Sequence, residues 1–182
     1  MTKRLNKENK NTPTSYVQKP SDWFDLKRLK ILMKYWEFGK LLDLGSFGDE
    51  AYRIQDFQLG TQRCPKVYKS IDWVPEILPH KDNEFDYVVM GQLLEHLEDP
   101  AKYFKEAMRV LKVGGVLALS VPLNETEAGE VDGIYHLWFY SEQDIIDLIK
   151  PYGRYEIEIL KSQHIPSYSY HFPHIIAFVQ KQ

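Results

Sequence analysis

Short apolar runs alternate with helix-forming segments along most of the chain, and this alternation constrains the fold more than any other feature. Strands separated by helices pair in parallel, with helices covering both faces of the sheet. Two further strands follow each other at the C-terminal end without a helix between them. We therefore expect an α/β fold with a mostly parallel sheet and an antiparallel C-terminal pair. The expected strands are 40–44, 65–72, 85–91, 116–122, 154–162 and 174–181.

Helix boundaries are marked by capping residues. Asp99 and Pro100 open one helix, and Gly114-Gly115 are expected to end it. Ser141 and Asp144 have the spacing of a capping box. The other expected helices cover 21–38 and 49–58, and the apolar stripe expected on the helix after Asp99 comprises Ala101, Phe104, Ala107, Met108 and Leu111.

Ligands of such sheets bind at the carboxyl ends of the strands, so the turn after the first strand is a candidate site. The sequence there is LLDLGSFGDE, residues 41–50. Asp43 can accept hydrogen bonds, while Gly45 and Gly48 would let a ligand approach the backbone. Alone, this pattern is equally compatible with a tight turn that uses glycine.

Residues 77–122, ILPHKDNEFDYVVMGQLLEHLEDPAKYFKEAMRVLKVGGVLALSVP, resemble the class I S-adenosylmethionine-dependent methyltransferases, specifically the type-11 methyltransferase domain. The resemblance extends over residues 40 to 150. It implies a Rossmann-like methyltransferase sheet and S-adenosyl-L-methionine as the cofactor. Asp43, Gly45, Ser46, Phe47 and Gly48 would then hold its methionine moiety. The second and third glycine positions of the family motif are Phe47 and Asp49 here, unless one residue is inserted and Gly48 serves as the second glycine. The Phe47 ring either crowds the cofactor or covers part of it.

The chain between Gly48 and Phe85 is short for this family, with room for one clear strand where two are usual. The sheet is therefore expected to be shortened in the middle. Asp72 would either bind the ribose hydroxyls, because a carboxylate accepts two hydrogen bonds, or lie near the adenine. The alternative is that Asp72 is a surface residue that caps a turn. Trp73 either stacks on the adenine or belongs to the core. Met90, Gly91 and Gln92 would lie beside the transferring methyl group.

Glu95, His96 and His136 are weak candidates for a metal site. Some O-methyltransferases of this class, including ubiquinone-pathway and small-RNA 2′-O enzymes, bind a divalent ion through Glu-x-x-Glu-His. This chain has Gln92 at the first position, so the sequence favours no metal. The alternatives are a local Glu-His pair at a helix start and His96 as a general base.

The acceptor pocket is expected from two loops, 123–138 and 162–174. The second loop contains Tyr168, Tyr170 and Phe172 together with His164, His171 and His174, and it could form a lid, pack on itself or make a homodimer contact. The resemblance implies a small-molecule acceptor, whose methylated atom (O, N or C) is open.

The overall composition limits the kinds of partner and environment expected for this chain. There are 23 basic and 26 acidic residues, so no extended cationic surface for nucleic acid is expected. Cys64 is the one cysteine, which is compatible with a reducing cytoplasm. No apolar run is long enough to span a membrane. Residues 1–20 are expected to be a disordered tail, and 21–182 a single domain.

Three functions remain from these expectations. The first is methyl transfer to a small-molecule acceptor. The second is a methyltransferase-like binding or regulatory protein that has lost catalysis, which the altered glycine turn and short middle would favour. The third, a nicotinamide-binding domain, is disfavoured because Gly-x-Gly-x-x-Gly is absent.

Overall fold

The computed structural model describes residues 23–37, 39–44, 67–71, 76–123, 130–131, 134–161 and 173–182. The expected tail at 1–20 and the expected helix at 49–58 lie outside these ranges. Within them, six strands form one sheet in the order β2-β1-β3-β4-β8-β7. The strands are β1 (Lys40–Leu44), β2 (Val67–Ile71), β3 (Phe85–Gly91), β4 (Leu111–Pro122), β7 (Gly153–Leu160) and β8 (His174–Lys181).

The strand directions are as the sequence predicted. Strands β2, β1, β3 and β4 are mutually parallel, β8 is antiparallel to β4, and β7 is antiparallel to β8. A two-stranded ribbon of β5 (Glu130–Val131) and β6 (Ile134–Tyr135) lies apart from this sheet. Among the described residues, β2 is the outermost strand on its side of the sheet.

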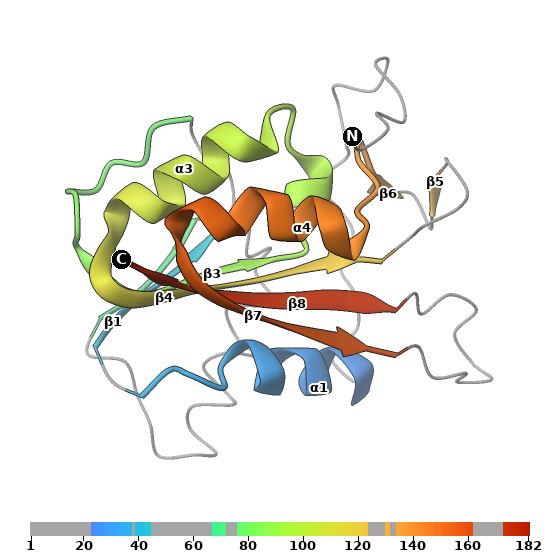
Figure 1. The fold of residues 1–182 in the computed structure, drawn as a ribbon, viewed down its shortest axis with the longest axis horizontal. Coiled ribbons are helices and arrows are strands. Elements are labelled where there is room, and N and C mark those ends of the chain that lie inside the picture. Colours follow the sequence, from blue (N-terminus) through green and yellow to red (C-terminus); the bar gives the residue numbers. More distant parts are fainter. Residues whose placement is uncertain are drawn as a thin grey trace.

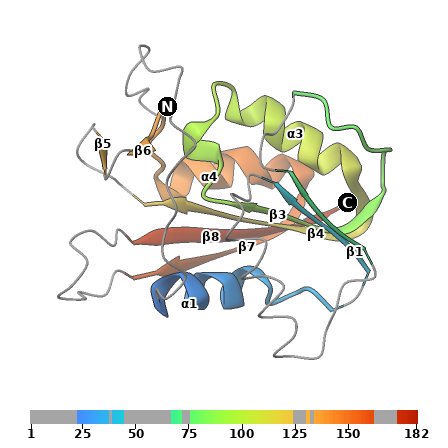
Figure 2. The same cartoon turned by 180° about the vertical axis from the view of Figure 1, so that it is seen from behind.

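The sheet is the middle of three layers. Helix α1 (Trp23–Leu32) covers one face, while α3 (Pro100–Val110) and α4 (Glu142–Ile149) cover the other (Figure 1, Figure 2). Two short 3₁₀ helices, η1 (Leu94–His96) and η2 (Lys150–Tyr152), complete the described elements. The carboxyl ends of the parallel strands therefore lie between α1 on one face of the sheet and α3 and α4 on the other.

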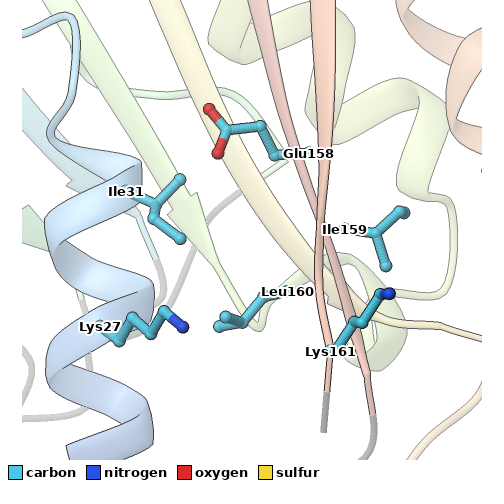
Figure 3. A pocket seen from close by; sticks show the side chains of 6 residues that line it. All are labelled: Lys27, Ile31, Glu158, Ile159, Leu160 and Lys161. Carbon is cyan, nitrogen blue, oxygen red and sulfur yellow. The ribbon is translucent and has the colours of Figure 1, made fainter.

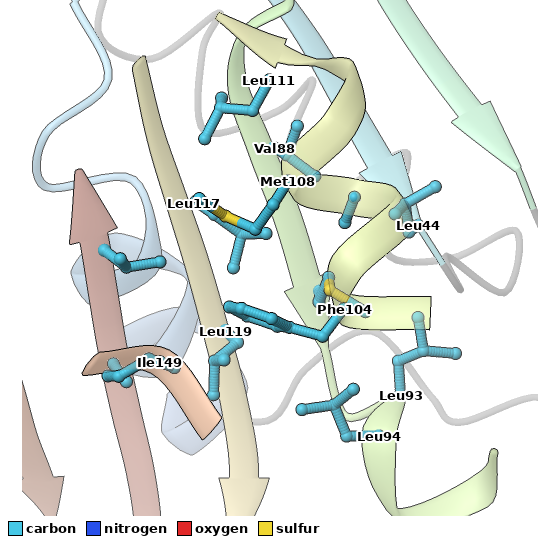
Figure 4. Close-up of a cluster of buried hydrophobic side chains, with 14 of the residues drawn as sticks. Leu44, Val88, Leu93, Leu94, Phe104, Met108, Leu111, Leu117, Leu119 and Ile149 are labelled. Carbon is cyan, nitrogen blue, oxygen red and sulfur yellow. The ribbon is translucent and has the colours of Figure 1, made fainter. Parts of the chain in front are cut away.

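The larger core lies between the sheet and helices α3 and α4. Phe104 and Met108 of α3 pack against Leu117 and Leu119 of β4 (Figure 4). On the opposite face, Leu29 and Leu32 of α1 form a second core together with Met33 and Trp36, which follow the helix. Both faces of the central strands are therefore buried, which explains their nearly continuous apolar sequences.

The predicted helix starts at Asp99 and Ser141 are confirmed. Asp99 caps α3, its Oδ1 accepting from the Lys102 amide at 3.1 Å, and Pro100 is the first helical residue. Ser141 and Asp144 form the full capping box of α4. Of the predicted stripe, Ala101 is exposed because it lies in the first turn of α3, where the helix faces solvent.

Two predicted helix ends are wrong. The helix expected at 21–38 ends at Leu32, where the Lys34 amide bonds to the Ile31 carbonyl at 2.9 Å and tightens the chain into turns. Helix α3 ends at Val110, and Gly114-Gly115 lie inside β4. Pairing between β3 and β4 shifts register in this region, and Gly114 has φ +80°. The glycines thus serve an irregular strand instead of a helix end.

Candidate functional site

The carboxyl ends of β1 and β3 lie side by side at the centre of the sheet. Asp43 of β1 is fully buried and pairs in register with Val89 of β3. Because strand residues alternate between faces, Asp43 shares the α1 side of the sheet with Leu41. A buried carboxylate at this edge is a ready acceptor for a cationic or N–H donor group.

Strand β3 ends in a sharp turn at Gly91 and Gln92. Met90 is buried toward α3, and Gln92 has φ +52°, a left-handed conformation that non-glycine residues rarely adopt. The Gln92 amide is fixed there by a 2.9 Å bond to the Ser120 carbonyl of β4. Such uncommon backbone conformations cluster at functional sites, and this one follows Gly91, where the missing side chain allows close approach.

Gln92 also takes part in a polar array that joins four elements. Its Nε2 lies 3.4 Å from Ser120 Oγ, and its Oε1 lies 3.1 Å from His174 Nε2 at the start of β8. Arg28 of α1, which is almost fully buried, donates from Nη1 to Ser120 Oγ at 3.0 Å. The array therefore connects α1 and the carboxyl ends of β3 and β4 with His174 at the start of β8.

Sequence reasoning missed Arg28 and Ser120. Both carry a signal in retrospect, since each is a polar residue within an apolar pattern: Arg28 beside Leu29 on α1, and Ser120 within VLALSVP. Burial of a polar side chain needs a hydrogen-bond partner, so such interruptions point to paired polar groups across elements.

The structure brings Glu95, His96 and His136 together, although they come from separate segments. One ligand atom from each of the three side chains lies within 4.8 Å of the other two. Glu95 is fully buried, and the rings of His96 and His136 meet edge to face at 4.9 Å between centroids. Gln92 is not part of this group, because its amide is directed to Ser120 and His174.

Burial raises the pKa of the Tyr140 phenol, and the charge of nearby Glu95 raises it further. Tyr140 therefore keeps its proton and donates to the Leu94 carbonyl at 3.1 Å. This bond places the segment that carries His136 against η1.

The remaining predicted site residues fall outside the described ranges. They are Gly45, Ser46, Phe47 and Gly48, which directly follow β1, and Asp72 and Trp73, which directly follow β2. Leu44 pairs with Ile71, so β1 and β2 end at the same edge of the sheet. Of the 162–174 loop, Tyr168, Tyr170, Phe172, His164 and His171 are outside the description as well.

Two open hollows lie away from the carboxyl ends of β1 and β3. One, of about 390 Å³, lies between α1 and β7, where Lys27 and Leu160 face each other while Ile159 points away (Figure 3). The other, of about 560 Å³, is lined by acidic residues such as Asp144 together with Trp138. Asp43, Gly91 and Gln92 line neither hollow, so we do not assign either one to a cofactor.

The polar groups at the carboxyl ends of β1 and β3 suit a nucleoside cofactor that carries an amino acid. The Asp43 carboxylate can hold an ammonium group, and the bare Gly91 backbone admits a ligand beside it. A mostly parallel sheet with such a site at its central carboxyl ends defines a Rossmann-like cofactor-binding protein. None of the helices in the described part of the chain has the length and apolar run needed to span a bilayer.

Comparison with known proteins specifies the family. Residues 61–119 match the model of a methyltransferase domain. An uncharacterised protein of Methanocaldococcus jannaschii is 33% identical over 165 residues, covering 79% of this chain and 80% of its own. The chain belongs to the class I S-adenosylmethionine-dependent methyltransferases of the type-11 domain family, and its cofactor is S-adenosylmethionine.

Solved structures share the fold at low sequence identity. A Thermotoga maritima protein, titled a possible histamine N-methyltransferase, has a TM-score of 0.61 at 20% identity, covering 87% of this chain and 93% of its own. The Burkholderia thailandensis 1,6-didemethyltoxoflavin-N1-methyltransferase, solved with S-adenosylhomocysteine, has a TM-score of 0.59 at 15% identity, covering 88% and 79%. These likenesses support the predicted Rossmann-like methyltransferase sheet.

Proposed function

We propose that this protein is an enzyme that transfers the methyl group of S-adenosylmethionine to a small-molecule acceptor. One observation carries the proposal: the buried Asp43 carboxylate lies beside the end of β3, at the edge of the sheet where β1 ends. In this family that edge holds the methionine part of the cofactor. Two proteins that share the fold are named for small-molecule acceptors, histamine and 1,6-didemethyltoxoflavin, which supports a small acceptor here.

Each predicted cofactor residue has a distinct task in this proposal. Asp43 accepts hydrogen bonds from the ammonium group or from turn amides, and the backbone of 45–48, with Ser46 and Phe47, lines the methionine. Asp72 accepts from both ribose hydroxyls, and Trp73 stacks on the adenine. Met90, Gly91 and Gln92 form the wall beside the methyl group.

The chemistry demands little beyond alignment. The bound cofactor supplies a methyl group already activated by the sulfonium, so the protein mainly positions a nucleophile in line with it and excludes water. His96 remains a weak candidate for a general base, which an acceptor hydroxyl would need. The loops 123–138 and 162–174 are proposed to line the acceptor pocket, with His174 at the end of the second loop bonded to Gln92.

Calorimetric titration of the full chain with S-adenosylmethionine and S-adenosylhomocysteine tests the proposal. Micromolar affinity is expected, and Asp72→Asn should weaken it because the ribose loses its charged acceptor. Small hydroxyl, amine and carbon acceptors would then be screened for turnover, measured as release of S-adenosylhomocysteine. Affinity for both compounds without turnover on any acceptor would leave cofactor binding standing and remove methyl transfer.

The second candidate is a binding or regulatory protein that has lost catalysis. Phe47 at a glycine position and the short stretch of chain between Gly48 and Phe85 favour it. It predicts weak or absent binding of both compounds, without turnover on any acceptor. Size-exclusion chromatography on the same sample would test whether the chain forms a homodimer.

A further inference from the structure

We propose that the outer edge of strand β7 pairs with the same edge of a second copy of this chain and forms a two-fold symmetric dimer. Strand β7 is the last strand of the sheet, and within the described residues its one strand partner is β8. Figure 1 looks onto this edge, where β7 runs between α4 and α1 with no described helix in front of it. The backbone on this side of β7 can therefore pair with a further strand.

Strand β7 lacks several features by which proteins usually block an open edge. Its eight residues pair with β8 without a register shift, so no bulge turns the edge away. No proline lies between Gly153 and Leu160. Short strands, bulges and prolines are common means of preventing edge-to-edge pairing, and this regular strand has none of them.

Charged side chains can also block an edge, but those of β7 are balanced. Arg154, Glu156 and Glu158 lie on the α1 side of the strand, as do the β8 residues with which they pair. Lys34 Nζ lies 2.7 Å from Glu156 Oε1 and 2.6 Å from Glu158 Oε1. Two positive and two negative side chains thus leave this side of the edge neutral, and a second copy meets no net repulsion.

The opposite side of β7 is apolar. Tyr155, Ile157 and Ile159 alternate with the charged residues, and Ile157 packs in part against the larger core. Tyr155 remains 46% exposed and Ile159 37% exposed. A second copy of β7 would bring the same three apolar side chains beside these, and the removal of apolar surface from water favours that contact.

Two-fold symmetry restricts the register of such a pair. An axis perpendicular to the sheet makes the two strands antiparallel and places one residue opposite its own copy. With Glu156 at the axis, Arg154 lies opposite Glu158 of the partner subunit, and Tyr155 lies opposite Ile157 of the partner subunit. Symmetry repeats each pair, so opposite charges and apolar side chains are matched twice, as stable cross-strand pairs require.

The neighbouring register is less favourable. With Ile157 at the axis, Glu156 would lie opposite Glu158 of the partner subunit, and this like-charge pair would occur twice. In the proposed register the one like-charge pair is Glu156 with its own copy at the axis. Each of these carboxylates keeps Lys34 beside it, which offsets the repulsion.

The proposed dimer interface is separate from the proposed cofactor site. Strand β7 and strand β1, which carries Asp43, are separated in the sheet by β3, β4 and β8. The antiparallel arrangement directs the carboxyl ends of β1 and β3 to opposite edges of the joined sheet in the two copies. The inference therefore does not rest on methyl transfer, and each can fail without the other.

Sedimentation velocity of the full chain over the micromolar concentration range tests the proposal. We expect a monomer–dimer equilibrium with a micromolar dissociation constant. Arg154→Glu and Glu158→Arg should each raise this constant roughly tenfold, because each turns two attractive pairs into repulsive ones. The double variant exchanges the two charges and should restore the dissociation constant of the unmodified chain.

Lys105→Glu is the matched control, because Lys105 is exposed on α3 and the same reversal of charge there should leave the dissociation constant unchanged. Circular dichroism shows whether each variant folds. A chain that stays monomeric throughout the range, as it would if another segment of the chain or a different protein occupied this edge, would overturn the proposal. So would association that neither single variant weakens, or that the double variant fails to restore.

Discussion

Arg28 of helix α1 reaches across a layer boundary to Ser120 at the end of β4, with 3.0 Å between Nη1 and Oγ. Both residues are buried, so the bond forms away from bulk water. Helix α1, which precedes the sheet in sequence, is thereby bonded to the edge of the sheet at which methyltransferases of this family bind their cofactor. The bond gives α1 a role in the site that its apolar packing alone would not.

Ser120→Ala should lower the free energy of unfolding by about 1–3 kcal/mol, because the buried Arg28 guanidinium loses this acceptor. Urea denaturation would measure the change. A double-mutant cycle with Arg28→Met separates this bond from other effects of either substitution. A coupling energy below about 0.5 kcal/mol would show that the Arg28–Ser120 contact does not stabilise the fold.

Asp43→Asn should weaken S-adenosylhomocysteine binding roughly ten- to hundredfold, since charge-assisted hydrogen bonds contribute about 1.5–3 kcal/mol each. Asparagine keeps the shape of the buried side chain and removes its charge, so the fold should persist in circular dichroism. Calorimetric titration checks the affinity. Asp82→Asn, an exposed carboxylate that pairs with Arg109, serves as the control and should bind as the unmodified chain does. Equal affinities for both variants would remove Asp43 from the site.

Sequence reasoning located elements well where local signals and tertiary structure agree. Strand β3 has the predicted bounds because an aromatic and β-branched run lies between a polar turn and a glycine. The starts of α3 and α4 follow from Asp99 and Ser141, whose side chains cap the helices through local bonds. Such features depend on residues a few positions apart and can be read without the fold.

The misplaced features depend on distant residues. Gly114-Gly115 look like a helix end, but β4 starts earlier because Leu111 pairs with Phe85. The Arg28–Ser120 bond joins residues 92 positions apart, so no local pattern predicts it. Sequence analysis identified Glu95, His96 and His136 as weak candidates. That they lie together depends on the packing of the segment after β6 against η1, which no local pattern predicts.

Gly115→Ala should destabilise the protein by about 1–3 kcal/mol, because the added methyl group would lie 2.9 Å from the Asp86 carbonyl oxygen. Backbone cannot move aside as a flexible side chain does. Gly114→Ala is the matched comparison: it meets no atom within 4 Å, and its cost of about 1–2 kcal/mol comes from φ +80° alone. Urea denaturation of both variants distinguishes crowding from backbone strain. A stable Gly115→Ala protein would show that the irregular pairing of β3 and β4 can relax.

Asp86 links three strands, and its contribution to stability should depend on pH. Its Oδ1 lies 2.5 Å from Lys112 Nζ of β4, and its Oδ2 accepts from the Lys40 amide of β1 at 2.8 Å. Partial burial acts to raise the pKa of Asp86, but these two hydrogen bonds and the positive charges of Lys112 and Lys40 together outweigh it and hold the pKa below its ordinary value of 3.8.

A carboxyl group whose pKa is lowered by folding stabilises the folded state above its unfolded pKa, and this stabilisation is lost as the pH falls. Asp86→Asn should therefore be less stable than the unmodified chain at neutral pH, and the difference should shrink as the pH falls below 3.8. Urea denaturation of both proteins across this range measures the difference. Lys112→Met should reproduce part of the loss at neutral pH. A difference between Asp86→Asn and the unmodified chain that stays constant at all pH values would show that the charge of Asp86 contributes nothing.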